Sequence, residues 1–238
     1  MSGGTVECWG QNTYGQLGDG STTNRLEPVP VKGISSGATG ISAGGNHTCA
    51  VVAGAVECWG DNAAGQLGNA SQVNSSQPVP VSGLSSGVTA VSSGMSHACA
   101  LTTAGAAMCW GDDSAGQLGN GTSGTTSDVP VAVTGLSSGV TGIYAGEYHT
   151  CALAAVGVAQ CWGENMNGQL GQGVAGNATD APTPVQMLSP PASAMSAGQY
   201  HTCALTAGRV QCWGMGGNGQ LGAGSYNDSY VPVAVAEP

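Results

Sequence analysis

The sequence has very little positive charge. Three basic residues (Arg25, Lys32 and Arg209) are set against thirteen acidic ones, and the formal net charge is −10 over 238 residues. Nucleic-acid binding depends on Lys and Arg side chains that neutralise phosphates, and docking on anionic membranes depends on the same side chains. We therefore expect no nucleic-acid partner and no attachment to anionic lipid.

The sequence also lacks a long apolar run and a leader. No apolar stretch approaches the eighteen or so residues of a membrane span, and the N-terminal residues 1–4 contain neither a charged segment nor an apolar one. We expect no membrane span and no signal peptide in this chain. Charged residues make up only 7%, so the surface polarity must come mainly from Ser, Thr, Asn, Gln and the backbone.

What the sequence does contain is a repeat of about fifty residues. Cys-Trp-Gly occurs five times, at spacings of 50, 51, 52 and 51 residues, and each copy continues into Gly-Gln-Leu-Gly, a polar loop and a Pro-Val segment or a variant of it. A His-Thr-Cys-Ala segment, or a close variant, precedes four of the five copies. Each period thus holds four short β-type segments separated by turn residues, which is typical of a propeller blade.

The repeat predicts an all-β fold, a β-propeller of four-stranded blades with about four and a half blades in this chain. The ring is expected to be incomplete or open, because the chain stops after a Pro-Val segment and begins just before a Cys-Trp-Gly. The predicted single repeat domain, 1–238, divides into a half blade and four blades: 1–37, 38–87, 88–139, 140–191 and 192–238.

The repeated motif also carries a family resemblance. His-Thr-Cys-Ala-Leu, then Gly-x-Val-x-Cys-Trp-Gly-x-Asn-x-x-Gly-Gln-Leu-Gly and Pro-Val, resembles the repeat of the regulator-of-chromosome-condensation family over essentially the whole chain. The resemblance implies a propeller that usually closes with seven blades. Cysteine in place of aliphatic residues resembles bacterial extracellular members more than nuclear ones. The resemblance also suggests guanine-nucleotide exchange as an alternative function, although the loop insertions and full ring on which that activity depends are not visible.

The nine cysteines form two sets, one in Cys-Trp-Gly and one in His-x-Cys. A two-residue turn between Cys49 and Cys58 places them directly opposite each other on paired strands, within reach of a disulfide. The same reasoning, with three-residue loops in two cases, predicts four hairpin disulfides: Cys49–Cys58, Cys99–Cys109, Cys151–Cys161 and Cys203–Cys212. The alternatives are reduced, packed thiols, and zinc held by His47, Cys49, Cys58 and a fourth ligand, but no candidate for that ligand repeats.

Disulfides indicate an oxidising compartment, so we expect an extracellular or cell-envelope location. Because no signal peptide is present, the chain is interpreted as a fragment of a longer secreted protein or as an engineered one. Cys8 has no His-x-Cys partner and is predicted to be unpaired, or to bridge to a second chain.

The histidines and tryptophans recur in register, which favours structural roles over catalytic ones. The four histidines (His47, His97, His149 and His201) are expected to hydrogen-bond a neighbouring loop or blade rather than to act as bases. The five tryptophans (Trp9, Trp59, Trp110, Trp162 and Trp213) are expected to pack between blades near Gly-Gln-Leu-Gly, the alternative being a stacking platform for sugars or bases. We find no nucleophile–base pair and no phosphate loop, and expect no enzyme activity, no cofactor and no metal.

The loops between Gly-Gln-Leu-Gly and Pro-Val vary most between repeats. Loops on a rigid scaffold are where recognition usually occurs, and Tyr226 and Tyr230 make the last of them the best candidate contact. The leading hypothesis is a non-enzymatic propeller that binds a protein or glycan through these loops. The alternative from another class is a structural module whose open ends drive homo-oligomerisation.

Overall fold

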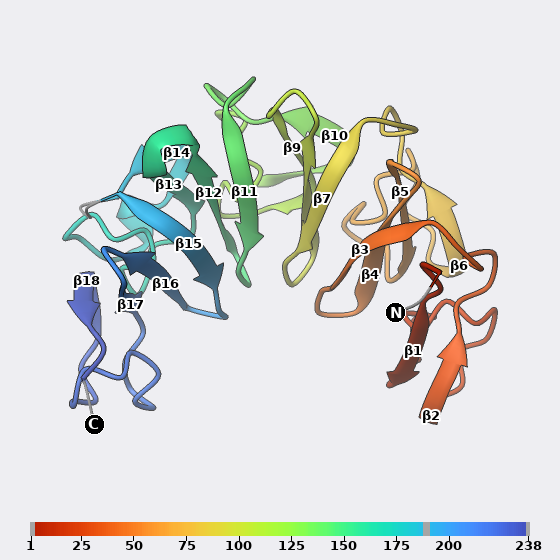
Figure 1. The fold of residues 1–238 in the computed structure, drawn as a ribbon, viewed down its shortest axis with the longest axis horizontal. Coiled ribbons are helices and arrows are strands. Elements are labelled where there is room, and N and C mark those ends of the chain that lie inside the picture. Colours follow the sequence, from red (N-terminus) through yellow and green to blue (C-terminus); the bar gives the residue numbers. More distant parts are fainter. Residues whose placement is uncertain (1–2, 188–190, 237–238) are drawn as a thin grey trace.

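The computed structural model describes residues 3–187 and 191–236 as an arc of five antiparallel sheets (Figure 1). Met1 and Ser2, which entered the argument about a signal peptide, lie outside the described residues. The first sheet has two strands, β1 (Glu7–Gly10) and β2 (Arg25–Pro30), and we call it the half blade. The other four sheets have four strands each, and we call them blades 1 to 4.

Each blade runs through its strands in sequence order. Blade 1 contains β3 (Ala38–Ala43), β4 (His47–Val52), β5 (Ala55–Gly60) and β6 (Ser75–Pro80); blade 2 contains β7 (Val88–Ser93), β8 (His97–Thr102), β9 (Ala107–Asp113) and β10 (Thr125–Ala132). Blade 3 contains β11 (Val140–Ala145), β12 (His149–Ala154), β13 (Ala159–Gly163) and β14 (Ala181–Gln186); blade 4 contains β15 (Ala192–Ala197), β16 (His201–Thr206), β17 (Arg209–Gly214) and β18 (Ser229–Ala234). Two short 3-10 turns, η1 (Ala155–Gly157) and η2 (Asn177–Thr179), lie in connections.

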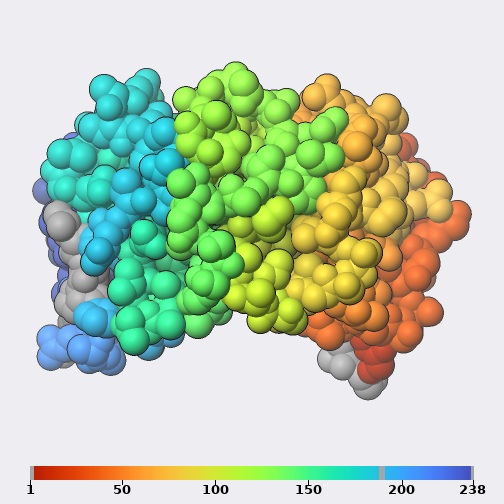
Figure 2. Space-filling model, turned by 90° about the horizontal axis from the view of Figure 1, so that it is seen from above, coloured from red at the N-terminus to blue at the C-terminus, as the bar shows by residue number. Residues whose placement is uncertain are grey.

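The first strand of each blade lies on the concave side of the arc, and neighbouring first strands contact one another (Figure 1). The opposite, convex side shows the blades next to each other in chain order (Figure 2). The all-β propeller fold predicted from the repeat is confirmed, with four blades and one two-stranded half blade among the described residues. The described residues contain no helix that is long and apolar enough to cross a membrane.

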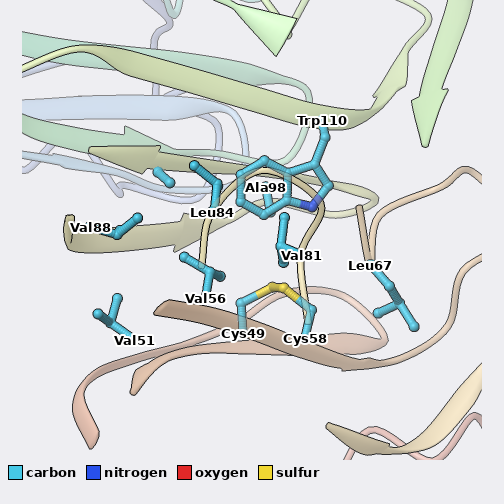
Figure 3. Packing of buried hydrophobic residues seen from close by; sticks show 11 residues of the cluster. Cys49, Val51, Val56, Cys58, Leu67, Val81, Leu84, Val88, Ala98 and Trp110 are labelled. Atoms are coloured by element: carbon cyan, nitrogen blue, oxygen red, sulfur yellow. A yellow bond between two sulfur atoms is a disulfide. The ribbon is translucent and has the colours of Figure 1, made fainter. Parts of the chain in front are cut away.

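The hydrophobic core lies between the blades. The cluster in Figure 3 combines the Cys49–Cys58 disulfide, Val56 and Val81 of blade 1 with Trp110 and other residues of blade 2. Equivalent clusters join blade 2 to blade 3 and blade 3 to blade 4. Since each blade buries its apolar face against the next, the stability of one blade depends on its neighbours.

The connections of a four-stranded meander emerge at two opposite ends. One end holds the turns between the first and second strands (44–46, 94–96, 146–148 and 198–200) and the long connections between the third and fourth; we call it the loop face. The other end, the turn face, holds the turns between the second and third strands (53–54, 103–106, 155–158 and 207–208). The variable loops predicted as the recognition surface therefore lie on the loop face.

Candidate functional site

The four hairpin disulfides of the structure have the pairing predicted from the sequence: Cys49–Cys58, Cys99–Cys109, Cys151–Cys161 and Cys203–Cys212. Each joins directly opposed residues of the second and third strands, with Cα atoms 4.0–4.1 Å apart. A sulfur atom in a disulfide is not available as a thiolate ligand, so the zinc alternative at His47, Cys49 and Cys58 has no support. Among the described residues there is no group of three or more His, Cys, Asp or Glu side chains that could hold a metal.

Four of the five tryptophans lie between blades and are fully buried. In each case the indole Nε1 donates a hydrogen bond of 2.8–2.9 Å to the glutamine carbonyl of the preceding Gly-Gln-Leu-Gly: Trp59 to Gln16, Trp110 to Gln66, Trp162 to Gln117 and Trp213 to Gln169. The last glycine of the motif allows this approach, since a Cβ on Gly68 would lie 2.8 Å from the Trp110 ring. The tryptophans thus fasten each blade to the one before it.

Trp9 is the exception to the prediction that all five tryptophans pack between blades. Its side chain is 63% exposed. The physical reason is that it belongs to the half blade, and no described residue places a Gly-Gln-Leu-Gly turn against that side. Trp9 and the free Cys8 line a pocket of about 350 Å³ together with Leu17 and Ile41. Burial raises the pKa of the Cys8 thiol to about 11, so the thiol is protonated and unreactive at neutral pH.

The buried histidines connect neighbouring blades. Nε2 of His97 lies 3.0 Å from Thr150 Oγ1, which in turn donates to the carbonyl of Gln117 at 2.9 Å. Because the threonine hydroxyl has one proton and the carbonyl can only accept, the histidine is the donor and carries its proton on Nε2. His149 and Thr202 repeat the arrangement one blade further on. Burial lowers the pKa of both His97 and His149 to about 3, which keeps them neutral.

His47 and His201 lack this partner. The residue opposite His47 is Ala98 where the other blades have threonine, and both ring nitrogens of His47 are buried without a hydrogen bond among the described atoms. His201 belongs to the last blade and is only partly buried. The expected hydrogen bond to a neighbouring blade is therefore present for His97 and His149 and absent for His47 and His201. The hydrogen bond forms only where the next blade places a threonine opposite the histidine, as Thr150 and Thr202 do.

A set of buried side chains, three amides and one carboxyl, was not identified from the sequence as functional. The side chain of Asn62 is fully buried; its Oδ1 accepts from the backbone of Leu67, and its Nδ2 donates to the carbonyls of Ser71 and Val73. Asn12, Asn165 and Asp113 occupy the same position in three other repeats. The Gly-x-Asn of the repeat was the available clue. These side chains hold the variable loops in a fixed shape from inside.

The two tyrosines predicted as contacts have different surroundings. Tyr226 is 76% exposed in the last variable loop. Tyr230 is less exposed, because its ring packs against Gly168 of the preceding repeat, where a Cβ would come within 2.5 Å of it. Tyr226 is thus free to meet a partner, while Tyr230 also contributes to the contact between blades 3 and 4.

Comparison with known proteins places the chain among proteins with the same repeat. The RCC1-like domain model matches residues 1–238. The ultraviolet-B receptor UVR8 of Arabidopsis thaliana is 30% identical over 98% of this chain and 54% of its own length, and the probable E3 ubiquitin-protein ligase HERC4 of Homo sapiens is 35% identical over 97% of this chain and 17% of its own. The chain thus spans about half of the first relative and less of the second.

Solved structures show the same fold at lower identity. Human WBSCR16 superposes with a TM-score of 0.86 at 24% identity, covering 99% of this chain and 63% of that one. Prp20p of Saccharomyces cerevisiae superposes with a TM-score of 0.85, also at 24% identity, covering 98% and 59%. The repeat, the inter-blade contacts and the full-length family match agree: the chain belongs to the RCC1-like domain family.

Proposed function

We propose that the chain is a non-enzymatic binding module that recognises a protein partner through the variable loops of the loop face. The observation that carries the proposal is the contrast between fixed loop interiors and exposed loop tips. The Asn62 amide holds its loop by four hydrogen bonds, while Val73 in that loop is 73% exposed. Variable side chains presented on a rigid backbone are typical of recognition surfaces.

The comparisons are compatible with a protein partner. Prp20p, which has the same fold, is described as binding Gsp1p and histones. Its 24% identity supports the fold alone, so neither partner is transferred to this chain. Nothing in the described loops favours nucleotide exchange, which stays a prediction from the family resemblance.

Photo-crosslinking tests the proposal. A photoreactive phenylalanine analogue is placed at Val73 or Tyr226 on the loop face, and as a matched control at Val156, which is 87% exposed on the turn face. We expect protein adducts from Val73 and Tyr226 and none from Val156. Adducts from Val156 alone would contradict the proposal, and a glycan-array signal without protein adducts would replace the protein partner by a glycan.

We also propose an extracellular or cell-envelope location. The four disulfides support it, because such bonds persist in oxidising compartments and are rare in reducing ones. The protein is purified from its natural source and then unfolded in the presence of a thiol-blocking reagent. We expect the reagent to modify Cys8 alone, because the other eight cysteines are in disulfides. Blocking of all nine cysteines would place the protein in a reducing compartment.

A second candidate function is self-association through the exposed edge of β1. Two features of this edge support it: among the described residues β1 is paired on one side only, and Trp9 is exposed. An unpaired strand with an apolar side chain beside it favours pairing with another chain, and a second copy is the proposed occupant. Light scattering is expected to show a dimer or larger species that Trp9→Ser converts to monomer; a monomeric wild type at micromolar concentration would contradict this candidate.

A further inference from the structure

Neighbouring sheets are joined by the same contact at four places along the arc. A tryptophan of the later sheet donates its indole hydrogen bond to a glutamine carbonyl of the earlier one. The last glycine of the same Gly-Gln-Leu-Gly leaves room for the ring, because a Cβ there would lie 2.6–2.8 Å from it in all four junctions. An apolar side chain directly after the fourth strand packs in the same cluster and is only 3–4% exposed: Val31, Val81, Val133 and Met187. Figure 3 shows the contact between Trp110 and Val81.

The outer face of blade 4 has this contact surface without a tryptophan. Among the described residues no tryptophan donates to the fifth glutamine carbonyl, that of Gln220. A Cβ on Gly222 would have Val235 as its nearest neighbour in place of a ring. Val235 directly follows the fourth strand, as Val81 does in blade 1, yet it is 36% exposed where Val81 is buried. Blade 4 therefore presents an apolar surface of the shape that receives a tryptophan elsewhere in the chain.

The outer face of the half blade has the complementary tryptophan. Trp9 has the position in β1 that Trp59 has in β5, since the cysteine before it pairs with the same residue of the fourth strand in both sheets. Trp59 is fully buried against the preceding sheet, whereas Trp9 is 63% exposed. An exposed tryptophan is among the side chains that contribute most to protein interfaces. The two ends of the arc thus carry the two halves of one contact.

A second contact between neighbouring sheets uses the main chain and is divided between the two ends in the same way. In four junctions the first glycine of Gly-Gln-Leu-Gly lies so close to one residue of the next fourth strand that an added Cβ would come within 2.5–2.7 Å of it: Ser76, Asp128, Pro182 and Tyr230. The carbonyl of that residue accepts from a loop N–H at 2.7–2.9 Å. Because four different side chains occupy the position, the contact depends on the backbone. The half blade has Leu26 at this position, 99% exposed, and blade 4 has Gly219, against which no further fourth strand lies among the described residues.

We propose that the outer face of the half blade stacks on the outer face of blade 4 of a second copy of this chain, with Trp9 at the centre of the contact. In this head-to-tail junction the Trp9 indole donates to the Gln220 carbonyl and its ring covers Val235. The main chain at Leu26 lies on Gly219. The two faces are at opposite ends of the open arc in Figure 1, so a single chain does not bring its own faces together. Each added copy leaves one face of either kind open, as in other heterologous assemblies. The inference rests on the proposed self-association and names the surface that receives Trp9.

Two complementary variants, compared by sedimentation velocity, test the proposal. Trp9→Ser removes the ring from the half blade, and Val235→Lys places a charge on the outer face of blade 4. Both side chains are exposed in the single chain, so neither substitution opens the core. Val73→Lys, in a loop in the interior of the arc, is the matched control. At roughly 10–100 μM we expect wild type and Val73→Lys to form dimers and larger species, and each of the other two variants to associate at least about tenfold more weakly.

Mixing the two variants distinguishes this junction from other forms of self-association. Trp9→Ser keeps an intact blade 4 face and Val235→Lys keeps an intact half blade, so an equimolar mixture is expected to form dimers and nothing larger. Formation of that dimer also shows that both variants are folded.

Pairing of β1 with β1 of a second copy would give a different result, because Val235→Lys would then associate on its own. Association of Val235→Lys alone, or a mixture that stays monomeric while Val73→Lys associates, would overturn the head-to-tail junction and leave self-association in place. A monomeric wild type would contradict both. Photo-crosslinking from the loop face would still report on the proposed protein partner, so its failure is distinguishable from failure of this inference.

Discussion

The histidine–threonine contact between blades offers a reciprocal test, because the chain contains both the complete and the interrupted form. His97 donates to Thr150, whereas His47 faces Ala98 and has no partner. Thr150→Ala therefore converts one junction into the other, and Ala98→Thr does the reverse. If the contact stabilises the stack, the two substitutions must change the free energy of unfolding in opposite directions.

The magnitude follows from what Thr150 contacts. Its hydroxyl accepts from His97 and donates to the Gln117 carbonyl, and the side chain is fully buried. Removing it leaves a buried N–H without a partner, at a cost of about 1–3 kcal/mol, and removes a buried methyl group, at a cost of about 1 kcal/mol. We expect Thr150→Ala to lower the free energy of unfolding by about 2–4 kcal/mol. Ala98→Thr should raise it by about 1 kcal/mol, since it supplies His47 with an acceptor.

Urea unfolding followed by tryptophan fluorescence measures both effects. Thr89→Ala is the matched control, because Thr89 Oγ1 also donates to a carbonyl, that of Leu101, from an exposed position; we expect a change below about 0.5 kcal/mol. Equal small losses for Thr150→Ala and Thr89→Ala would refute the reasoning. So would a loss of stability in Ala98→Thr, which would mean that the site at Ala98 is already filled.

Three further predictions concern stability. Burial lowers the pKa of His97 and His149 to about 3, so the contribution of the neutral rings to the free energy of unfolding is present above pH 6.5 and is lost as the pH falls towards 3. By pH 4.5 the loss is about 2–3 kcal/mol for each histidine. A free energy of unfolding that stays constant from pH 7 to 4.5 in urea titrations would contradict this prediction. Leu118→Ala, at a side chain packed under Trp162, should cost about 2–5 kcal/mol by the same assay, whereas Leu26→Ala, at a fully exposed leucine, should leave the unfolding midpoint in place. Replacing Cys49 and Cys58 together by Ala should cost about 2–3 kcal/mol, and a midpoint unchanged from wild type would show that this disulfide is dispensable.

The features predicted correctly are those that depend on local strand geometry. The position of Cys49 opposite Cys58 follows from a two-residue turn, and the four-stranded blades follow from the fifty-residue period. The packing of Trp59 under a neighbouring turn was predictable for the same reason, since every interior repeat has the same neighbours.

The features missed depend on what a neighbouring repeat supplies. Trp9 has the same motif as Trp59 but is exposed, because no Gly-Gln-Leu-Gly turn among the described residues packs against it. His47 lacks a partner because of Ala98, a substitution one blade away. Asn62 looks like an ordinary loop residue in the sequence. Its hydrogen bonds to the carbonyls of Ser71 and Val73 could not be predicted, because they depend on how the loop folds back over the Asn62 side chain. The backbone hydrogen bonds of Glu147 to the turns of the two neighbouring blades, at Met95 and Gln199, cannot be read from any single repeat.

The most direct test of the account is an amide hydrogen-exchange footprint of the partner captured by crosslinking. The chain is compared with and without that partner, and protection is measured in the variable loops, in the β11–β12 turn and in the β4–β5, β8–β9 and β12–β13 turns. We predict protection in the loop-face segments 69–74, 120–124 and 146–148, with the turn-face segments 53–54, 103–106 and 155–158 unchanged. Protection confined to the turn face would contradict the central claim that the loop face of this propeller is its recognition surface.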